Sequence, residues 1–416
     1  MKIAIVSQYY RPENAGYPNA LAAAFVARGH SVRVVTGFPN YPQGRIYEGY
    51  RQRVLHREDD AGVQVKRVPI FISHSRNPFG RLANYLSFGL SALFAGRFVR
   101  DADVVYVYAT QMTAAIAPQW WKWTLKIPYV LHIQDLWPES ITGSSMMRSQ
   151  LIGRIVSTLL KPWLQSSYRD ASAVLAIAPT MREMLLRRGA APDTTVTALN
   201  WAEPEPKPSS IDIDSEPLNA SSTCTVVYAG NLGEMQDLTT AIMAASQLTH
   251  LQGFRLIVYG AGVMEEELRR LVESLEVANI EMRGSLPLEE MPNVYALSDF
   301  QLITLRNLPI FRGTLPSKLQ SSLAYGVPVI SNVAGDLTDI VKSNGVGITC
   351  EPGDIGSLSR AFLQAYSLSA VDRESMARKA KLLYNQEMSR ERAIDRIESV
   401  LSAATGKGNT RRARDY

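Results

Sequence analysis

Apolar residues in this chain fall into short continuous runs that alternate with longer segments of helical composition. Residues 3–6 form the first run, residues 18–28 are rich in alanine, Gly29 marks a helix end, and residues 31–36 form a second run. Strands that are apolar throughout and separated by helices predict a parallel sheet covered on both faces. The same pattern predicts further strands at residues 102–108, 129–133 and 173–178.

A proline-rich polar segment, residues 202–210, interrupts this alternation and can form neither a helix nor a central strand. A second series of strands and helices follows it, so we expect an α/β protein with two doubly wound, Rossmann-like domains facing each other across a cleft. The strands expected in the second domain lie at residues 225–229, 255–259, 280–282, 300–304, 328–331 and 347–350.

The predicted division of the chain follows from this interruption. We expect an N-terminal acceptor-binding domain over 1–202, a linker over 203–222 and a C-terminal nucleotide-sugar-binding domain over 223–385. Residues 371–404 have a continuous helical composition, and we expect the last helix, 386–404, to return to the N-terminal domain. Residues 405–416 form a basic tail that we expect to be disordered and solubilising, with nucleic-acid binding as its alternative.

Composition excludes several classes of protein. With 46% hydrophobic and 20% charged residues, the 416-residue chain is neither collagen-like, coiled-coil nor disordered. The net charge of +5 favours anionic partners such as phosphates or a membrane surface. The two cysteines are expected to be free, and the five scattered histidines exclude a structural zinc site. The first residues are too short an apolar run for a signal peptide, so we expect a cytoplasmic protein.

Residues 311–330 carry the most informative pattern: a loop, a helix from 316 to 325, a stop at Gly326 and a buried strand. Thr314 is expected to cap this helix. A small-residue loop at a helix N-terminus favours an anion, because free N–H groups and the helix dipole both point at it. Arg312 and Lys318 add full charges there, although an ordinary helix start with two surface cations remains the alternative.

The run PSKLQSSLAYGVPVI at 316–330 is similar to the donor-site motif of GT-B glycosyltransferases of family 4. RGHSVRVVT at 28–36 resembles the first unit of that family, and LNW at 199–201, YAGNLG at 228–233 and YGAG at 259–262 continue the resemblance in order. FPNYPQG at 38–44 and QDLWPE at 134–139 look like the subgroup that builds bacterial capsules, O-antigens and colanic acid, with fucosamine-type transferases among them. The resemblance spans nearly the whole chain.

The resemblance implies a retaining, metal-independent transferase without a cofactor. It would move a hexosyl or N-acetylhexosaminyl group from a nucleoside-diphosphate sugar, with UDP favoured, to a saccharide or lipid-linked acceptor in polysaccharide or glycoconjugate biosynthesis. Negative charge on the departing β-phosphate would be stabilised by N–H groups at 313–315 together with Arg312 and Lys318. The donor-binding residues that we expect are Asn231, Gly233, Gly260, Arg283, Gly284, Gly313, Thr314, Leu315, Ser317 and Ser321.

The chain departs from the family pattern at the donor site. Many relatives carry two glutamates eight residues apart, and Gly313 and Ser321 hold those places here. Many also carry an arginine and a lysine after the first strand of the second domain, where this chain has Asn231 and Gln236. Charge compensation therefore shifts to Arg312 and Lys318, which we assign as catalytic together with Asp135.

In the first domain the family's histidine next to the reacting sugar is replaced by Gln134. Asp135 follows it at the carboxyl end of a strand, where we expect a polar group near the acceptor hydroxyl or, alternatively, a helix N-cap. His132 alternates with apolar residues and is expected to be a core histidine. The Asp-x-Asp pairs at 101–103 and 212–214 read as charged turns, so no metal site is predicted. The acceptor-binding residues that we expect are Asn14, Gly16, Tyr17, Gln134 and Glu139.

Three segments of the first domain join basic and aromatic or apolar residues: 81–100, 120–123 and 151–169. They predict either peripheral contact with the inner face of a membrane or packing in the domain core. No complete G-x-G-x-x-G follows the first strand of either half, which disfavours a dehydrogenase. A nucleotide-sugar 2-epimerase or phosphorylase of the same fold, and a non-catalytic sugar-nucleotide-binding partner of a transferase, remain alternatives. No nucleic-acid partner is predicted.

Overall fold

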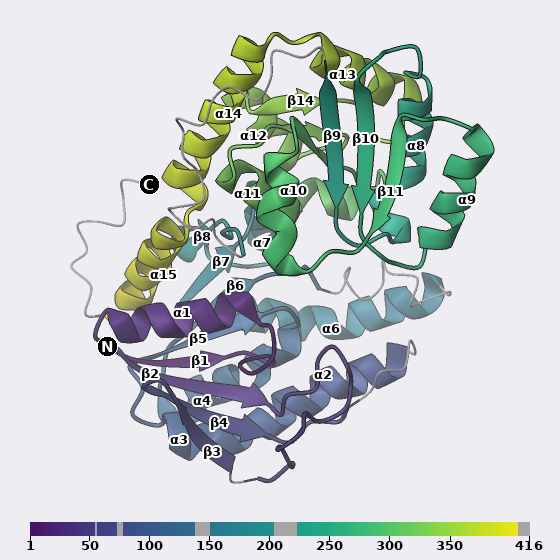
Figure 1. Ribbon diagram of the computed structural model, residues 1–416. Helices are drawn as coiled ribbons and strands as arrows, with labels where there is room; N and C mark the ends of the chain where they lie inside the picture. The colour runs from purple at the N-terminus through teal and green to yellow at the C-terminus, as the bar shows by residue number, and fades with distance from the viewer. Residues whose placement is uncertain (55, 73–77, 138–149, 204–222, 407–416) are drawn as a thin grey trace. The chain divides into compact units, whose positions relative to one another are not determined.

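The computed structural model describes residues 1–54, 56–72, 78–137, 150–203 and 223–406. Contacts between residues divide the chain into two compact units. The N-terminal unit is Met1–Ala198 together with the chain from Ile394 onwards, and the C-terminal unit is Leu199–Ala393 (Figure 1). Nearly all of the expected linker and of the basic tail lies outside the described residues.

The N-terminal unit is built on one eight-stranded sheet with the order β3-β4-β2-β1-β5-β6-β7-β8. β3 pairs antiparallel with β4, and the other pairs recorded among the described residues are parallel. The strands are β1 (Lys2–Val6), β2 (Ser31–Gly37), β3 (His56–Asp60), β4 (Val63–Val68), β5 (Val104–Ala109), β6 (Tyr129–Ile133), β7 (Ala173–Ala176) and β8 (Thr195–Thr197).

Helices cover both faces of this sheet, with α1 on one side and α2 and α4 on the other (Figure 1). This is the doubly wound arrangement that the alternation of apolar runs predicts. The helices are α1 (Gly16–Ala27), α2 (Pro78–Ala92), η1 (Leu93–Ala95), α3 (Gly96–Val99), η2 (Met112–Ala115), α4 (Ile116–Leu125), α6 (Gln150–Asp170) and α7 (Pro179–Arg187).

The hairpin of β3 and β4 has no counterpart in the sequence prediction. β3 reads HREDD and lies at the sheet edge, where charged side chains face solvent and leave no apolar signal. β4 contains Lys66 and Arg67, both almost fully buried. Arg67 is held by the Glu58 carboxylate and by the carbonyl groups of Gly37 and Arg11, so its charge is satisfied inside the fold.

The C-terminal unit has a six-stranded parallel sheet with the order β11-β10-β9-β12-β13-β14. The strand order reverses between β9 and β12, which is the switch point where such sheets bind ligands. Its elements are β9 (Cys224–Ala229), α8 (Leu238–Ser246), β10 (Phe254–Tyr259), α9 (Glu265–Leu275), β11 (Ile280–Gly284), α10 (Met291–Ala296), β12 (Phe300–Ile303), η7 (Pro309–Gly313), α11 (Ser317–Ala324), β13 (Val329–Ser331), α12 (Asp336–Asn344), β14 (Gly347–Thr349) and α13 (Ile355–Ser367).

The helical stretch expected over 371–404 is divided into separate helices, and the last of them begins at Arg390 rather than at residue 386. α14 (Ala370–Leu383) runs into a π-helical turn (Tyr384–Met388), and α15 (Arg390–Ala404) starts afresh. Ser389 is extended and its hydroxyl accepts the backbone N–H of Arg392, as the cap of a new helix does.

α15 joins the N-terminal unit through ion pairs. Arg28 bonds both Asp395, at 2.7 Å, and Glu398, and the Nε2 atom of His30 lies 2.7 Å from Glu398. On the same helix Ile397 and Leu401 are fully buried.

Cys224 and Cys350 are both free thiols. Among the helices of the described segments, none is both long enough and apolar enough to cross a membrane.

Candidate functional site

Two loops lie side by side at the switch point of the C-terminal sheet. One follows β9 and runs from Gly230 to Gln236, and the other follows β12 and leads into α11. The Thr304 hydroxyl donates to the Gln236 carbonyl at 2.6 Å, and the Arg306 N–H donates to the Met235 carbonyl at 2.9 Å. These bonds hold the two loops together at the edge of the sheet where doubly wound folds bind their ligands.

Lys318, in the first turn of α11, reaches back over β9. Its ammonium lies 4.7 Å from the centre of the Tyr228 ring. It also lies against Gly230, where a Cβ atom would come within 2.9 Å of Nζ. Burial lowers the pKa of Lys318 to about 8, and within the described parts of the chain no charged group offsets this effect. The switch point therefore holds a partly desolvated cation that an incoming anion would neutralise.

The residues around Lys318 show how α11 begins. Thr314 ends the 3₁₀ helix η7 and does not cap α11, so that expectation is wrong. Pro316 precedes α11 instead, and no described side chain caps the helix, because proline fixes the backbone there without a capping oxygen. Gly313 and Leu315 are buried and Ser317 is exposed. Uncapped N–H groups thus accompany the lysine.

Arg312 is exposed at the end of η7. The backbone is closely packed there, because a Cβ atom on Gly335 would lie 2.1 Å from the Arg312 carbonyl oxygen. Arg312 belongs to the same loop as the start of α11, and its guanidinium group stays accessible to a ligand.

Glycines allow the loops after β9 and β10 to touch. Gly260 has φ +145°, and a Cβ atom on it would lie 1.8 Å from the Gly230 carbonyl oxygen. Gly233 lies between the side chains of Asn231 and Gln236, each 2.7 Å from the position of its missing Cβ. Close approach of the neighbouring backbone therefore requires glycine at position 260, whereas the atoms next to Gly233 are the ends of flexible side chains that can move aside.

Two predicted donor-binding side chains have partners within the protein. Arg283 pairs with Glu281 at 2.6 Å and donates to the Tyr259 hydroxyl at 2.9 Å. Ser321 hydrogen-bonds to Tyr295. The carbonyl of Gly284 accepts the Gly260 N–H at 2.7 Å. At this edge of the sheet, the side chains of Arg283 and Ser321 are therefore bound by other groups of the protein.

Sequence reasoning missed a buried amide that ties three loops together. The Asn332 side chain, after β13, is fully buried and accepts the Leu305 N–H at 3.1 Å. It also donates to the Asp237 carboxylate at 3.2 Å, and burial raises the pKa of that carboxyl group. The two side chains are 95 residues apart in sequence, and neither belongs to a recognisable motif.

In the N-terminal unit, Gln134 and Asp135 directly follow β6, as predicted. Gln134 is nearly buried, whereas the side chain of Asp135 reaches the surface. The protein around Asp135 still removes part of the water from its carboxyl group, and this desolvation raises the pKa of that group. His132 is fully buried, with Nδ1 2.6 Å from the Tyr106 hydroxyl. Burial lowers the pKa of His132 to about 3, so it is a neutral core histidine. Glu139 lies outside the described residues.

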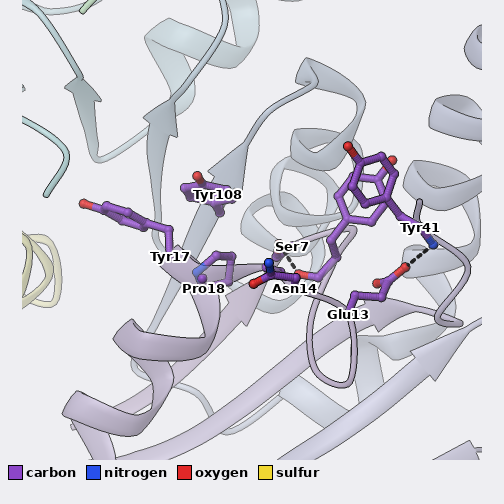
Figure 2. Close-up of a pocket in the computed structure, with 10 residues that line it drawn as sticks. Ser7, Glu13, Asn14, Tyr17, Pro18, Tyr41 and Tyr108 are labelled. Atoms are coloured by element: carbon purple, nitrogen blue, oxygen red, sulfur yellow. Dashed lines mark hydrogen bonds between the residues drawn. The ribbon is translucent and has the colours of Figure 1, made fainter. Parts of the chain in front are cut away.

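A pocket of about 200 Å³ opens where β1 ends and α1 begins (Figure 2). Three of the residues that we expect to bind the acceptor, Asn14, Gly16 and Tyr17, line this pocket. Sequence reasoning missed most of its aromatic side chains, because they come from three separate segments. The other lining residues are Ser7, Tyr9, Glu13, Ala15, Pro18, Tyr41 and Tyr108.

Metal-binding groups do not gather in the described part of the chain, where no three histidine, cysteine, aspartate or glutamate side chains come together. Asp101 pairs with Arg33 and Lys2, and Asp103 accepts the Lys2 backbone N–H. Both aspartates therefore have partners within the protein, as charged residues of a turn commonly do. Asp212 and Asp214 lie outside the described residues.

The fold and the switch-point loops define a class of protein, the GT-B fold with two Rossmann-like domains. A family model described as "Glycosyl transferase 4-like domain" matches residues 15–201, and one described as "Glycosyl transferases group 1" matches residues 211–383. The chain belongs to the group 1 glycosyltransferases, family 4.

Individual relatives are distant. The "Putative colanic acid biosynthesis glycosyl transferase WcaI" of Escherichia coli K12 is 25% identical over 382 residues, covering 88% of this chain and 93% of that protein. The crystal structure of Anabaena Alr3699/HepE in complex with UDP has a TM-score of 0.67 at 16% identity, covering 97% of this chain and 100% of the other. The same protein in complex with UDP-glucose has a TM-score of 0.64 at 17% identity and the same coverage.

Proposed function

We propose that this protein is a retaining, metal-independent glycosyltransferase that moves a hexosyl or N-acetylhexosaminyl group from a UDP-sugar to a saccharide or lipid-linked acceptor. The observation that carries the donor side is Lys318, a desolvated cation without a described counter-charge at the switch point of the C-terminal sheet. A nucleoside diphosphate supplies the missing negative charge. The relative bound to UDP in its crystal structure supports UDP as the nucleotide.

The charge that develops in the reaction suits these groups. As the bond between the sugar and the β-phosphate breaks, negative charge grows on the phosphate oxygens. Lys318, Arg312 and the uncapped N–H groups at the start of α11 are fixed donors that stabilise this charge without reorganising. A positive charge already in place does the work that a divalent cation does in metal-dependent enzymes.

We assign the acceptor side to the N-terminal unit, with Asp135 as the polar group near the acceptor hydroxyl. Its pKa is raised, which suits a carboxylate that accepts a proton. Asp135→Asn is expected to lower kcat at least tenfold and to leave the Kd for UDP within about twofold of wild type. Steady-state kinetics and calorimetric titration with UDP measure the two effects. Loss of UDP binding with an unchanged kcat would contradict the acceptor-side role.

The reaction itself is tested by incubating the protein with UDP-sugars in EDTA and following UDP release, then product formation with added saccharides. Proton NMR of the product gives the anomeric configuration. Transfer with retained configuration in EDTA is the expected result. Epimerised UDP-sugar, UDP binding without turnover, or an absolute requirement for Mg²⁺ would each overturn the proposal.

We further propose that the acceptor belongs to bacterial polysaccharide synthesis and is presented at a membrane. The relative named for colanic acid biosynthesis supports the first part. Exposed apolar side chains on α2, η1 and α4 support the second, because these elements pack against one another and carry exposed cations but few carboxylates. The exposed apolar residues on these elements are Leu86, Leu90, Phe94, Trp120, Trp123 and Leu125. The exposed cations are Arg81 on α2, Arg97 and Arg100 in and directly after α3, and Lys126 directly after α4.

Vesicle binding tests this surface. Vesicles containing phosphatidylglycerol are expected to sediment the protein at low salt, with less protein bound at high salt. The double substitution Phe94→Ser and Trp120→Ser should lower the bound fraction several-fold. Val371→Ser serves as the control, because Val371 is an apolar residue on another helix and is 70% exposed, close to the 75% of Phe94. Equal recovery in the supernatant with and without vesicles would rule out the membrane surface.

A further inference from the structure

We infer that the pocket at the end of β1 binds one uncharged sugar residue of the acceptor, held against tyrosine rings. The inference rests on the proposed function and names the class of acceptor that the site takes. Three features of the pocket support this assignment: its aromatic side chains, its charge and its size.

The aromatic side chains come in two pairs. Tyr17 and Tyr108 stack with ring centres 5.3 Å apart and planes 17° apart. Tyr9 and Tyr41 also lie 5.3 Å apart, at 50°. Figure 2 shows Tyr17 and Tyr108 on one side of Asn14 and Ser7, and Tyr41 on the other. Tyr17 and Tyr108 cover each other's inner ring faces, so the exposed ring of Tyr41 is the one that offers a face to the C–H side of a pyranose. The polar groups between the two pairs suit the hydroxyls of a sugar.

The charge of the pocket disfavours an anion. No lysine or arginine is among its described lining residues, and Glu13 is the one lining residue with a carboxylate. Arg67 and Arg81 act on Glu13 and Tyr9 from outside the lining, and Arg67 is itself buried against Glu58. A uronic acid or a sugar phosphate would enter beside a carboxylate without a lining cation to pair with.

Glu13 is a positioning residue. The residue is 2% exposed, and its carboxylate accepts the backbone N–H groups of Asn40 and Tyr41 at 2.8 Å and that of Tyr10 at 3.4 Å. It therefore joins the loop after β1 to the loop after β2. The bond to the Tyr41 N–H sets the position of Tyr41, a residue that lines the pocket and is 54% exposed.

The volume of the pocket limits the size of the ligand that it can hold. About 200 Å³ is less than the ~300 Å³ at which pockets for drug-sized ligands begin. A space of this size suits one sugar residue better than a whole disaccharide. The pocket therefore selects the terminal residue of the acceptor and leaves the rest of the acceptor outside.

The test uses the full-length protein and saturation-transfer NMR with methyl glycosides of glucose, galactose and N-acetylglucosamine. Each is compared with its uronate or 6-phosphate counterpart. We expect at least one neutral glycoside to bind through its ring protons and to bind at least tenfold more tightly than its anionic counterpart. Tyr41→Ala should abolish the signal and Tyr41→Phe should retain it. Phe71→Ala is the matched control, because Phe71 is an aromatic residue with the same exposed fraction of 54% outside the pocket.

Titration with UDP on the same samples distinguishes a failure of the pocket assignment from a failure of the proposed transferase function. UDP binding without any neutral glycoside binding overturns the pocket assignment and leaves the transferase standing. Tighter binding of the uronate or phosphate, or unchanged binding by Tyr41→Ala, also overturns it. A neutral glycoside that binds in a protein unable to bind UDP supports the pocket and contradicts the proposed donor site.

Discussion

Lys318→Ala is expected to lower kcat/KM for the UDP-sugar by roughly 30- to 1,000-fold. The change removes the cation that would face the departing β-phosphate, and loss of one such donor costs about 2–4 kcal/mol of transition-state stabilisation. Steady-state kinetics with varied donor measure the effect. Kinetics equal to those of wild type would refute the assignment of Lys318 to the phosphate.

The pKa of Lys318 gives this prediction a pH signature. With a pKa of about 8 in the free protein, the lysine is charged below pH 8 and neutral above it. Because kcat/KM reports the free enzyme, we expect it to fall as pH rises through about 8. Lys318→Arg keeps its charge throughout this range, so any residual activity of that variant should lack the fall.

The same lysine is expected to destabilise the folded protein. Its folded pKa lies below the ordinary value of 10.5, so the unfolded chain binds more protons between pH 8 and 10.5 and stability rises with pH in that window. Below pH 8 the cost is on the order of 3 kcal/mol. Lys318→Met should therefore be inactive yet no less stable than wild type at pH 7, which separates lost catalysis from lost folding.

Gly260→Ala is expected to destabilise the C-terminal unit by at least ~3 kcal/mol. The alanine Cβ would lie 1.8 Å from the Gly230 carbonyl oxygen, at a φ of +145° that residues other than glycine rarely adopt. The contacting atom is backbone, so the two loops must separate to make room. Urea unfolding and the Kd for UDP should both report the loss.

Gly356→Ala is the matched control for that substitution. Gly356 lies in α13, and the atoms nearest to its missing Cβ are side-chain atoms at 3.4 Å or beyond, which is ordinary contact. The control should change stability by no more than about 1 kcal/mol. A Gly260→Ala protein as stable as this control would contradict the close approach of the two loops.

Much of the fold is predictable because both sheets are made of buried parallel strands. β6, reading YVLHI, is apolar enough to be located to the residue, and the strands of the C-terminal sheet shift by no more than two residues at either end. Where burial relies on satisfied charges, as at Arg67 on β4, the apolar signal disappears. The start of the last helix is expected a few residues too early, at 386 instead of Arg390, because the residues on both sides of Ser389 have helical composition.

The candidate site is predictable where its residues are consecutive. Arg312, Thr314 and Lys318 fall in one motif, although the motif did not show that Pro316 rather than Thr314 precedes the helix. Residues that only the fold brings together belong to no common sequence motif. Asp237 and Asn332 come from different loops, and Tyr9, Tyr41 and Tyr108 reach one pocket from three segments. A single sequence holds no information on which of these loops meet.

Thermal unfolding with UDP, GDP and dTDP, each with and without EDTA, tests the central claim most directly. A nucleotide that binds the native state raises the melting temperature by mass action. We expect UDP to raise the melting temperature of the wild-type protein equally with and without EDTA, and to have little effect on the Lys318→Ala protein. No shift with any nucleotide, or a shift that EDTA removes, would contradict a metal-independent diphosphate site at Lys318.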